Sequence, residues 1–338
     1  MGISLETIRF LVRELRDVPL GERALTLGVQ GVEGSYDEVR RIFSSAGWAV
    51  PALPDQEVVY DDVTQFGCSV HQSVLFRLMG YGQVESMDVF DHEHPTHMLD
   101  LNRPVPEALR GAYDLVYDGG TVEHVFSPKD ALFNVSALLK PGGVVVHHLP
   151  VNGYVNHGYY QFSPQLFFDY YGINGYTVLK AFLSYRHGGT YYQFALEHTS
   201  EIPQQGLGDE ALIYFVARKP QSWREPRIPL QGDAYRAAFI ARHRSHLEGR
   251  KVMVWGSGRL YEEFYRPCLA ELGEAVEVVG FIDNDERRHG SRVDARPVFS
   301  PRRLTQGDVD AVVIASMYRG DILGQIWSML GDSVIVCW

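Results

Sequence analysis

Residues 113–150 constrain the fold of this chain more than any other stretch of it. Residues 115–117 (Leu-Val-Tyr) are short, apolar and β-prone, which is typical of a buried strand. Ser127 then predicts a helix start, because serine caps helix N-termini and Pro128 fits the first turn. Residues 140–143 (Lys-Pro-Gly-Gly) end that helix, and three valines at 144–146 predict a second strand. A strand, a helix and a strand in so few residues predict a βαβ unit and therefore a parallel sheet.

The same stretch resembles the class I S-adenosylmethionine-dependent methyltransferases. Their fourth strand often reads Tyr-Asp-Leu-Val, as residues 113–116 do, and is followed by Glu-His, here Glu123 and His124. Their fifth strand is often preceded by Leu-Leu-Lys-Pro-Gly-Gly, here residues 138–143. The resemblance implies an α/β fold with a Rossmann-like, doubly wound mixed sheet, and methyl transfer from S-adenosylmethionine as the activity.

Composition limits the compartment and the partners that we expect. A chain of 338 residues predicts two domains, and a net charge of −11 argues against a nucleic-acid partner. The three cysteines (Cys68, Cys268 and Cys337) are far apart and lack C-x-x-C spacing, so we expect no disulfide framework or cysteine zinc site and predict a cytoplasmic protein. No apolar run is long enough to span a bilayer, so no membrane partner is expected, and a homodimer is left open.

The first strand, predicted at 24–28, leads into the turn where the family binds its cofactor. The family usually has an acid two positions before the first glycine and further glycines at alternating positions. Gly28 matches the first glycine, but Thr26 replaces the acid, and Gln30 and Val32 replace the later glycines. Glycine there lets the backbone approach the cofactor closely. Gln30 can instead hydrogen-bond a carboxylate, and a plain turn that binds no ligand is the alternative.

Two further segments complete the implied cofactor site. Asp88 ends the predicted second strand (84–88), where the family places an acid on the cofactor ribose; a turn-forming aspartate is the alternative. The predicted third strand and its exit, 98–102, would lie beside the adenine, with Asp100 accepting from the exocyclic amine and Leu101 lining the ring. The implied cofactor-binding residues are Gly28, Gln30, Asp88, Asp100, Leu101, Asp118 and Gly119.

The loop that follows the fifth strand, residues 151–162, leaves the carboxyl end of a central strand and should therefore wall the substrate pocket. Its polar and ionisable side chains suit recognition and acid–base chemistry, and an aromatic packing loop is the alternative. His147 and His148 are adjacent in a strand, so at most one can face a pocket. The candidate bases are His157, His124 and Glu123, in that order, and the candidate substrate-binding residues are His148, Asn156, Tyr159 and Gln161.

The remaining N-terminal segments are predicted from pattern alone. We expect helices at 4–16, 37–46 and 69–79, strands at 176–184 and 211–218, and an added strand or lid at 189–194. The run His92-Glu93-His94-Pro95-Thr96-His97 offers metal ligands, but the proline interrupts any element that would align them. An exposed loop without a metal is therefore the prediction.

Residues 219–249, rich in proline and then helical from 233 to 247, are predicted to link domain 1–218 to domain 250–338. The second domain resembles the small Rossmann-like domain of sugar C-methyltransferases and of some sugar-nucleotide acyltransferases, in the segments at 255–264, 280–285 and 295–304. Gly256 and Gly258, with Asp283, are candidates for cradling a phosphate, although the third glycine of a dinucleotide fingerprint is missing. A smaller parallel sheet is expected, with a structural or docking role as the alternative.

These observations favour S-adenosylmethionine-dependent methyl transfer to a small polar metabolite, sugar- or nucleotide-linked. The altered turn at Gly28 keeps a second hypothesis open: a methyltransferase-like fold that catalyses another biosynthetic step or binds a nucleotide-sugar. A nicotinamide-dependent oxidoreductase that uses the glycines near 256 ranks last, because that domain is short for a dinucleotide fold with its own catalytic partner.

Overall fold

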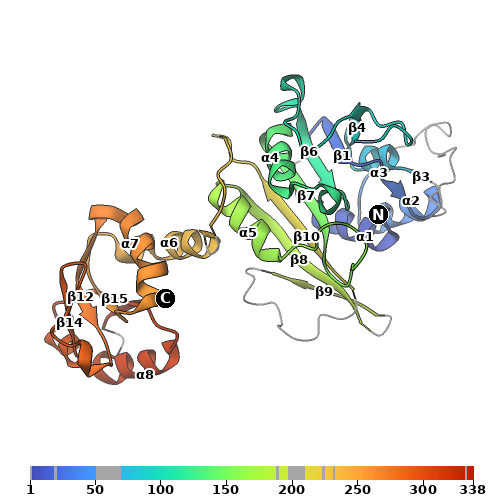
Figure 1. Ribbon diagram of the computed structural model, residues 1–338. Coiled ribbons are helices and arrows are strands. Elements are labelled where there is room, and N and C mark those ends of the chain that lie inside the picture. The colour runs from blue at the N-terminus through green and yellow to red at the C-terminus, as the bar shows by residue number, and fades with distance from the viewer. Residues whose placement is uncertain are drawn as a thin grey trace. The chain divides into compact units, whose positions relative to one another are not determined.

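The computed structural model describes residues 2–18, 21–50, 70–187, 190–196, 210–222, 225–230, 233–331 and 333–338. The chain folds into two compact units, Met1–Ile228 and Pro229–Trp338 (Figure 1). The predicted linker region 219–249 is therefore divided between them, and its helix belongs to the second unit. No helix among the described residues is both long and apolar enough to cross a membrane.

The N-terminal unit is built on an eight-stranded sheet with the order β5-β4-β1-β6-β7-β10-β8-β9. The strands from β5 to β7 run parallel, β10 is antiparallel to both β7 and β8, and β9 pairs with β8 as a hairpin. The bounds are β1 Arg23–Leu27, β4 Gln83–Asp88, β5 His97–Met98, β6 Tyr113–Asp118, β7 Leu139–Asn152, β8 Thr177–His187, β9 Thr190–Ala195 and β10 Glu210–Arg218, with β2 Gly31–Val32 and β3 Val70–His71 pairing separately. The predicted mixed sheet is confirmed.

Helices cover both faces of this sheet, as a doubly wound fold requires. One face carries α1 (Leu5–Glu14), α2 (Tyr36–Ser45) and α3 (Gln72–Leu78), and the other carries α4 (Pro128–Leu138) and α5 (Pro164–Ile173). Successive strand residues alternate between the two cores, so Leu115 and Tyr117 pack with the first set and Val116 with the second. Short 3₁₀ turns lie at η2 Glu107–Leu109 and η3 Val122–His124.

Three local predictions were wrong in detail. The third strand is only two residues long, because Asp100 accepts from the backbone and side-chain nitrogens of Asn102 and turns the chain. Ser127 does not cap the backbone of α4; its hydroxyl donates to Asp130 at 2.6 Å. β7 begins at Leu139, earlier than the strand predicted at 144–146, whereas the helix end predicted at 140–143 is confirmed because α4 ends at Leu138. The strand predicted near 189–194 is confirmed as β9, whereas Cys68, Ser69 and Gly189 lie outside the described residues.

A buried lysine closes the C-terminal end of α4. Lys219 is 3% exposed, and its Nζ donates to the backbone oxygens of Ser136 and Leu139 at 2.6 and 2.7 Å. These carbonyls lie at the negative end of the helix, where a cation is favourable. Burial lowers the pKa of Lys219 to about 8.

The C-terminal unit has a six-stranded sheet in the order β13-β14-β12-β11-β15-β16, parallel except for the β13–β14 hairpin. Its strands are β11 Arg250–Trp255, β12 Val276–Ile282, β13 Arg292–Val293, β14 Arg296–Phe299, β15 Ala311–Ile314 and β16 Ile335–Cys337. Its helices are α6 Asp233–Leu247, α7 Arg266–Leu272 and α8 Arg319–Leu330, with a π segment at Tyr261–Tyr265 and 3₁₀ turns at Gly273–Ala275, Glu286–Arg288 and Pro301–Gln306. The predicted smaller sheet is confirmed, with α6 and α7 over one face and α8 over the other.

Candidate functional site

A cavity of about 750 Å³ opens where the order of the parallel strands reverses. From β1 the chain moves outward to β4 and β5 and then returns to β6 on the other side of β1. In open α/β sheets this switch point leaves a crevice at the carboxyl ends of the strands, and ligands bind there. The cavity, which we call the crevice, is lined by Gly28, Val29, Gln30, Met87, Asp88, Val89, Phe90, Glu93, Leu99, Asp100, Leu101, Asn102, Gly120, Thr121, His124, Val125, Asn156, His157, Gly158 and Tyr159.

Gly28 turns the chain at the end of β1 and must be glycine. Its φ is +74°, and a Cβ there would stand 3.0 Å from Thr121 Oγ1 and 3.8 Å from Asp88 Oδ2. Thr26, which replaces the family's acid, is fully buried, and its hydroxyl donates to the Gly28 carbonyl at 2.9 Å. The threonine therefore stabilises the turn itself.

Gln30 lies against the wall of the crevice and leaves it open. Its Nε2 donates to the Leu27 carbonyl at 2.8 Å, and its backbone N–H donates to Gln72 Oε1 at 2.5 Å. One N–H of Nε2 is engaged in this way and the second makes no hydrogen bond with the described residues, so the bond from Gln30 to a carboxylate stays a prediction. Its Oε1 is buried and accepts no hydrogen bond from the described residues, so it suits a donor such as an ammonium group. Val32 is fully buried in the core and does not enter the crevice.

The predicted ribose and adenine residues lie together on one wall. Asp88 is half-buried and accepts from the Phe90 backbone at 2.9 Å through Oδ1, while Oδ2 accepts no hydrogen bond from the described residues. Val89 and Phe90 are 50% and 63% exposed, so apolar surface borders this carboxylate. Hydrogen bonds from Asn102 lower the pKa of Asp100, which keeps its carboxylate ionised. Leu101 also lines this wall.

Asp118 and Gly119 are not among the lining residues. Asp118 is fully buried, accepts from the backbones of Thr121 and Val122, and lies 2.7 Å from His147 Nδ1, whose Nε2 lies 2.6 Å from the Tyr171 hydroxyl. The predicted ligand contact of Asp118 is therefore wrong, because its carboxylate is occupied by the 119–122 turn and by His147. A Cβ on Gly119 would stand 2.5 Å from the Tyr117 ring, so this glycine permits close packing. Gly120 and Thr121 line the crevice instead, and sequence reasoning missed both.

The three candidate bases converge in one group beside the crevice. Glu123 is fully buried, and its Oε1 lies 3.5 Å from His157 Nε2 and 3.9 Å from His124 Nε2. The two imidazole centroids are 4.9 Å apart, and both rings line the crevice. We call Glu123, His124 and His157 the proton cluster.

Burial sets the protonation of this cluster. Neither carboxyl oxygen of Glu123 forms a hydrogen bond with the described residues, and burial, reinforced by the charge of Asp118, raises its pKa to about 8. Burial likewise lowers the pKa of His157 and of His124, the latter also through His157. At neutral pH the imidazoles are therefore neutral and able to accept a proton. Each of the three also offers a ligand atom within 4.8 Å of the others, a spacing that a metal could use.

The loop after β7 folds over the cluster because its backbone bonds to Glu123. The Glu123 carbonyl accepts from Tyr159 and Tyr160 at 2.9 and 3.2 Å. A Cβ on Gly158 would stand 2.9 Å from the same carbonyl, so only glycine passes there. Asn156 adopts a φ of +73°, and both it and Tyr159 line the crevice. The prediction that this loop walls the pocket is confirmed.

Two predicted substrate residues do not reach the crevice. His148 points to the sheet face opposite His147, stacks on Tyr214 with ring centroids 4.0 Å apart, and lines a separate cavity of about 260 Å³. Gln161 is exposed, and its Oε1 accepts from the Tyr154 backbone at 2.8 Å. Side chains alternate between the two faces of β7, so His148 faces away from the crevice. The hydrogen bond with the Tyr154 backbone keeps the Gln161 side chain outside the crevice.

The predicted histidine loop at 92–97 does not gather its imidazoles. His97 Nε2 lies 2.8 Å from Glu85 and 3.1 Å from the Tyr113 hydroxyl, inside the sheet edge. His92 is exposed and lies 3.7 Å from Glu93.

The glycine loop of the C-terminal unit is filled by its own side chains. Asp283 Oδ2 accepts from the backbone and hydroxyl of Ser257 at 3.1 and 2.6 Å, and Arg288 donates to the Ser257 carbonyl at 2.8 Å. Gly256 is required because a Cβ would stand 2.3 Å from the Ala315 carbonyl. An aspartate therefore takes the place that a phosphate would need, so the predicted phosphate cradle of Gly256, Gly258 and Asp283 does not fit.

A family model matches the chain within the C-terminal unit. Residues 248–333 match a family described as C2185-like, N-terminal, and no curated protein matches. Among solved structures, the chain is similar to the trans-methyltransferase CalH in complex with SAH (16% identity, TM-score 0.32, 64% of this chain and 55% of that one). It is also similar to a putative sarcosine dimethylglycine methyltransferase from Galdieria sulphuraria, with 13% identity and a TM-score of 0.35. That match covers 64% of this chain and 86% of the other. The chain thus spans about 55% of the length of the first. These weak likenesses carry no argument about function; strand order and direction give the N-terminal unit its methyltransferase-like fold.

Proposed function

We propose that the protein transfers a methyl group from S-adenosylmethionine to a small polar acceptor bound in the crevice. One observation carries this proposal: a single cavity joins a carboxylate with an unused oxygen, on Asp88, to a cluster of neutral imidazoles. The first suits a nucleoside ribose, and the second suits removal of a proton from an acceptor.

The residues of the cofactor wall fit a sulfonium nucleoside. Asp88 can accept hydrogen bonds from two vicinal hydroxyls, the apolar surfaces of Val89, Phe90 and Leu101 can pack on a purine, and the unpaired Oε1 of Gln30 can accept from an ammonium. When bound, S-adenosylmethionine supplies an electrophilic methyl group on a positively charged sulfur.

The proton cluster supplies the base. His157 is neutral at pH 7, because burial lowers its pKa, and can take the proton of an acceptor hydroxyl or amine. Glu123, whose Oε1 lies 3.5 Å from His157 Nε2, is protonated at pH 7 because its pKa is about 8, and it therefore borders the imidazolium that forms as a neutral carboxyl dipole. The polar side chains of Asn156 and Tyr159 favour a polar acceptor, and we extend the proposal to sugar- or nucleotide-linked metabolites on that basis.

A calorimetric titration with S-adenosylmethionine and S-adenosylhomocysteine tests the proposal. Asp88→Asn should weaken binding by about 10- to 100-fold, because a charge-assisted hydrogen bond contributes roughly 1.5–3 kcal/mol. The control is Asp91→Asn, which lies three residues on and does not line the crevice. Equal affinity of the two variants would remove Asp88 from the site.

One observation favours a second function. The backbone N–H of Gln30 is bonded to Gln72 and is not free for a ligand, so the first turn lacks a donor that a cofactor carboxylate would use. A nucleotide-sugar that copurifies with the protein, together with no binding of either sulfonium or thioether nucleoside, would favour a non-methylating enzyme or binding subunit.

A further inference from the structure

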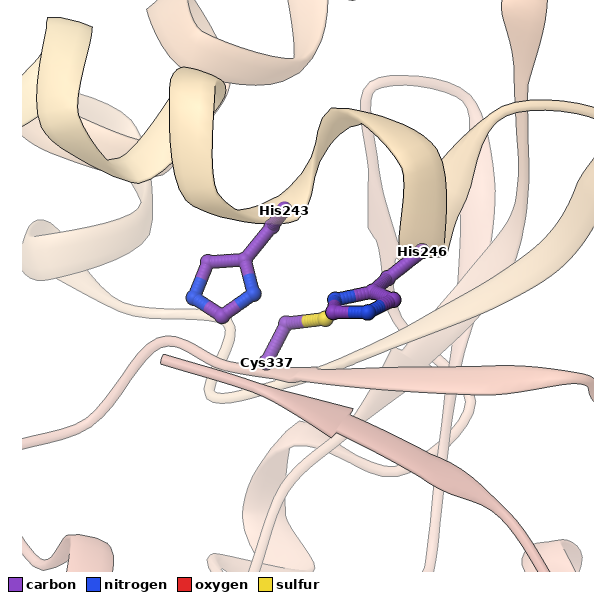
Figure 2. A group of neighbouring side chains, drawn as sticks. All are labelled: His243, His246 and Cys337. Atoms are coloured by element: carbon purple, nitrogen blue, oxygen red, sulfur yellow. The ribbon is translucent and has the colours of Figure 1, made fainter.

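Two imidazoles and a thiol meet between helix α6 and strand β16 of the C-terminal unit. His243 and His246 lie three residues apart on α6, and Cys337 lies in β16 (Figure 2). One ligand atom from each residue lies within 4.8 Å of the other two. Cys337 is fully buried, His243 is 7% exposed, and His246 is exposed to solvent.

The hydrogen bonding of His243 leaves one ring nitrogen ready to bind. Its Nε2 lies 3.2 Å from the backbone oxygen of Trp338, and since that oxygen can only accept, Nε2 carries the proton. Nδ1 therefore presents a lone pair, yet it is buried and has no hydrogen-bond partner among the described residues. A histidine that donates one ring N–H to a backbone carbonyl while its other nitrogen is free is oriented as metal-bound histidines are.

We propose that His243, His246 and Cys337 bind a zinc ion that fastens α6 to β16. Imidazole nitrogen and thiolate sulfur are the ligands that zinc prefers. Bond lengths of about 2.0–2.3 Å place the ligand atoms of a tetrahedral site roughly 3.3–3.7 Å apart. Since no two ligand atoms lie more than 4.8 Å apart, they need to approach by at most about 1.5 Å, and rotation of the exposed His246 ring can bring them closer. The fourth position faces the solvent-exposed side of the group and suits a water molecule.

Zinc is bound by thiolate sulfur, so the Cys337 thiol must lose its proton when the ion binds.

The place of the group in the fold gives the ion a structural role. β16 is an edge strand that pairs only with β15 among the described strands. α6 packs on this side of the sheet through Phe239, Ile240 and Leu247, in the same core as Cys337. A metal bound by the folded unit but not by the unfolded chain stabilises it by mass action.

The test uses the full chain after metal removal with a chelator. Zinc is titrated against a chromophoric chelator, and Co²⁺ is added separately to record its thiolate charge-transfer absorption. We expect one ion per chain, and loss of the cobalt–thiolate band in Cys337→Ser. We also expect at least about tenfold weaker zinc binding in His246→Asn, where the fold is preserved because the His246 side chain is exposed.

Cys268→Ser is the matched control, since Cys268 is equally buried in the same core but lies outside the group. It should bind zinc as the unaltered chain does. A cobalt–thiolate band that survives Cys337→Ser, or unchanged zinc affinity in His246→Asn, would overturn the proposal. Zinc binding that is lost instead in His124→Gln would place the ion in the crevice and would equally overturn it.

Discussion

Replacing Glu123 by glutamine should stabilise the N-terminal unit, and increasingly so as the pH rises. The substitution keeps the shape of the side chain and removes its ability to ionise. Glu123 is fully buried without a hydrogen-bond partner among the described residues, and its pKa rises from 4.5 to about 8. Ionisation of a carboxyl without a partner in this position costs free energy that glutamine never incurs.

The sign follows from the two protonation states. Below pH 4.5 both folded and unfolded chains carry protonated Glu123, and the stability that it contributes is fully present. As the pH rises towards 8 the unfolded chain ionises while the folded chain does not, so stability is lost. At about 1.4 kcal/mol for each pH unit, the shift from 4.5 to about 8 amounts to about 5 kcal/mol at high pH. Between pH 5.5 and 8.5 the advantage of the variant should grow by about 3 kcal/mol.

The assay is urea unfolding of both chains at pH 5.5, 7 and 8.5. Hydrogen exchange of peptides from β6 and β7 follows the N-terminal unit separately from the other unit. Other titrating groups are common to both chains and cancel in the difference. Glu107→Gln is the control, because the Glu107 side chain is 93% exposed and should give a difference near zero at every pH. A stability difference for Glu123→Gln that does not change with pH would refute the protonated, buried carboxyl.

Four further substitutions test other parts of the structure. Gly256→Ala should lower the melting temperature of the C-terminal unit, because the added Cβ would stand 2.3 Å from the Ala315 carbonyl. Gly324→Ala in α8 should instead raise the stability of this unit by about 0.5–1 kcal/mol, because its Cβ would meet no atom within 4 Å. Calorimetry measures both changes. Lys219→Ala should destabilise the N-terminal unit by about 2–4 kcal/mol in urea, because two carbonyls lose their buried donor. His157→Gln should lower kcat with little effect on cofactor affinity. It should also remove the acid limb of the kcat–pH profile, which lies below pH 6.5 because burial lowers the pKa of His157. An unchanged profile would exclude His157 as the base.

The fold was predictable because its signals are local. The strand, helix and strand at 113–150 show strong hydrophobic periodicity and are separated by turn-forming residues. The turn at Gly256 was also predictable from the residues next to it in the sequence. The hydrogen bonding at the C-terminal end of α4 was less predictable. It depends on Lys219, which lies 80 residues after Leu139 and donates a hydrogen bond to the Leu139 carbonyl.

The site was predictable only as far as strand ends could be located. Asp88 was placed by its position at the end of β4, and His124 and His157 by their positions after β6 and β7; all three line the crevice. The role of Asp118 was predicted wrongly because its hydrogen-bond partner His147 lies 29 residues later in the sequence and occupies the carboxylate. Pairs of distant residues decide which polar groups remain available to a ligand, and no pattern in one sequence reports them.

The same reason explains why the histidine and cysteine group was missed. Spacing among cysteines alone gave no reason to expect a metal, and His243 and His246 stand more than ninety positions before Cys337 in the chain. Only the packing of α6 against β16 makes them neighbours.

A crystal of the full chain soaked with S-adenosylhomocysteine tests the central claim most directly. The account predicts electron density for the nucleoside in the crevice, with its ribose hydroxyls on Asp88 and its thioether sulfur on the side of His157. Density for the nucleoside at another place would contradict the account. An empty crevice would also contradict it, in a crystal whose solvent channels reach the crevice.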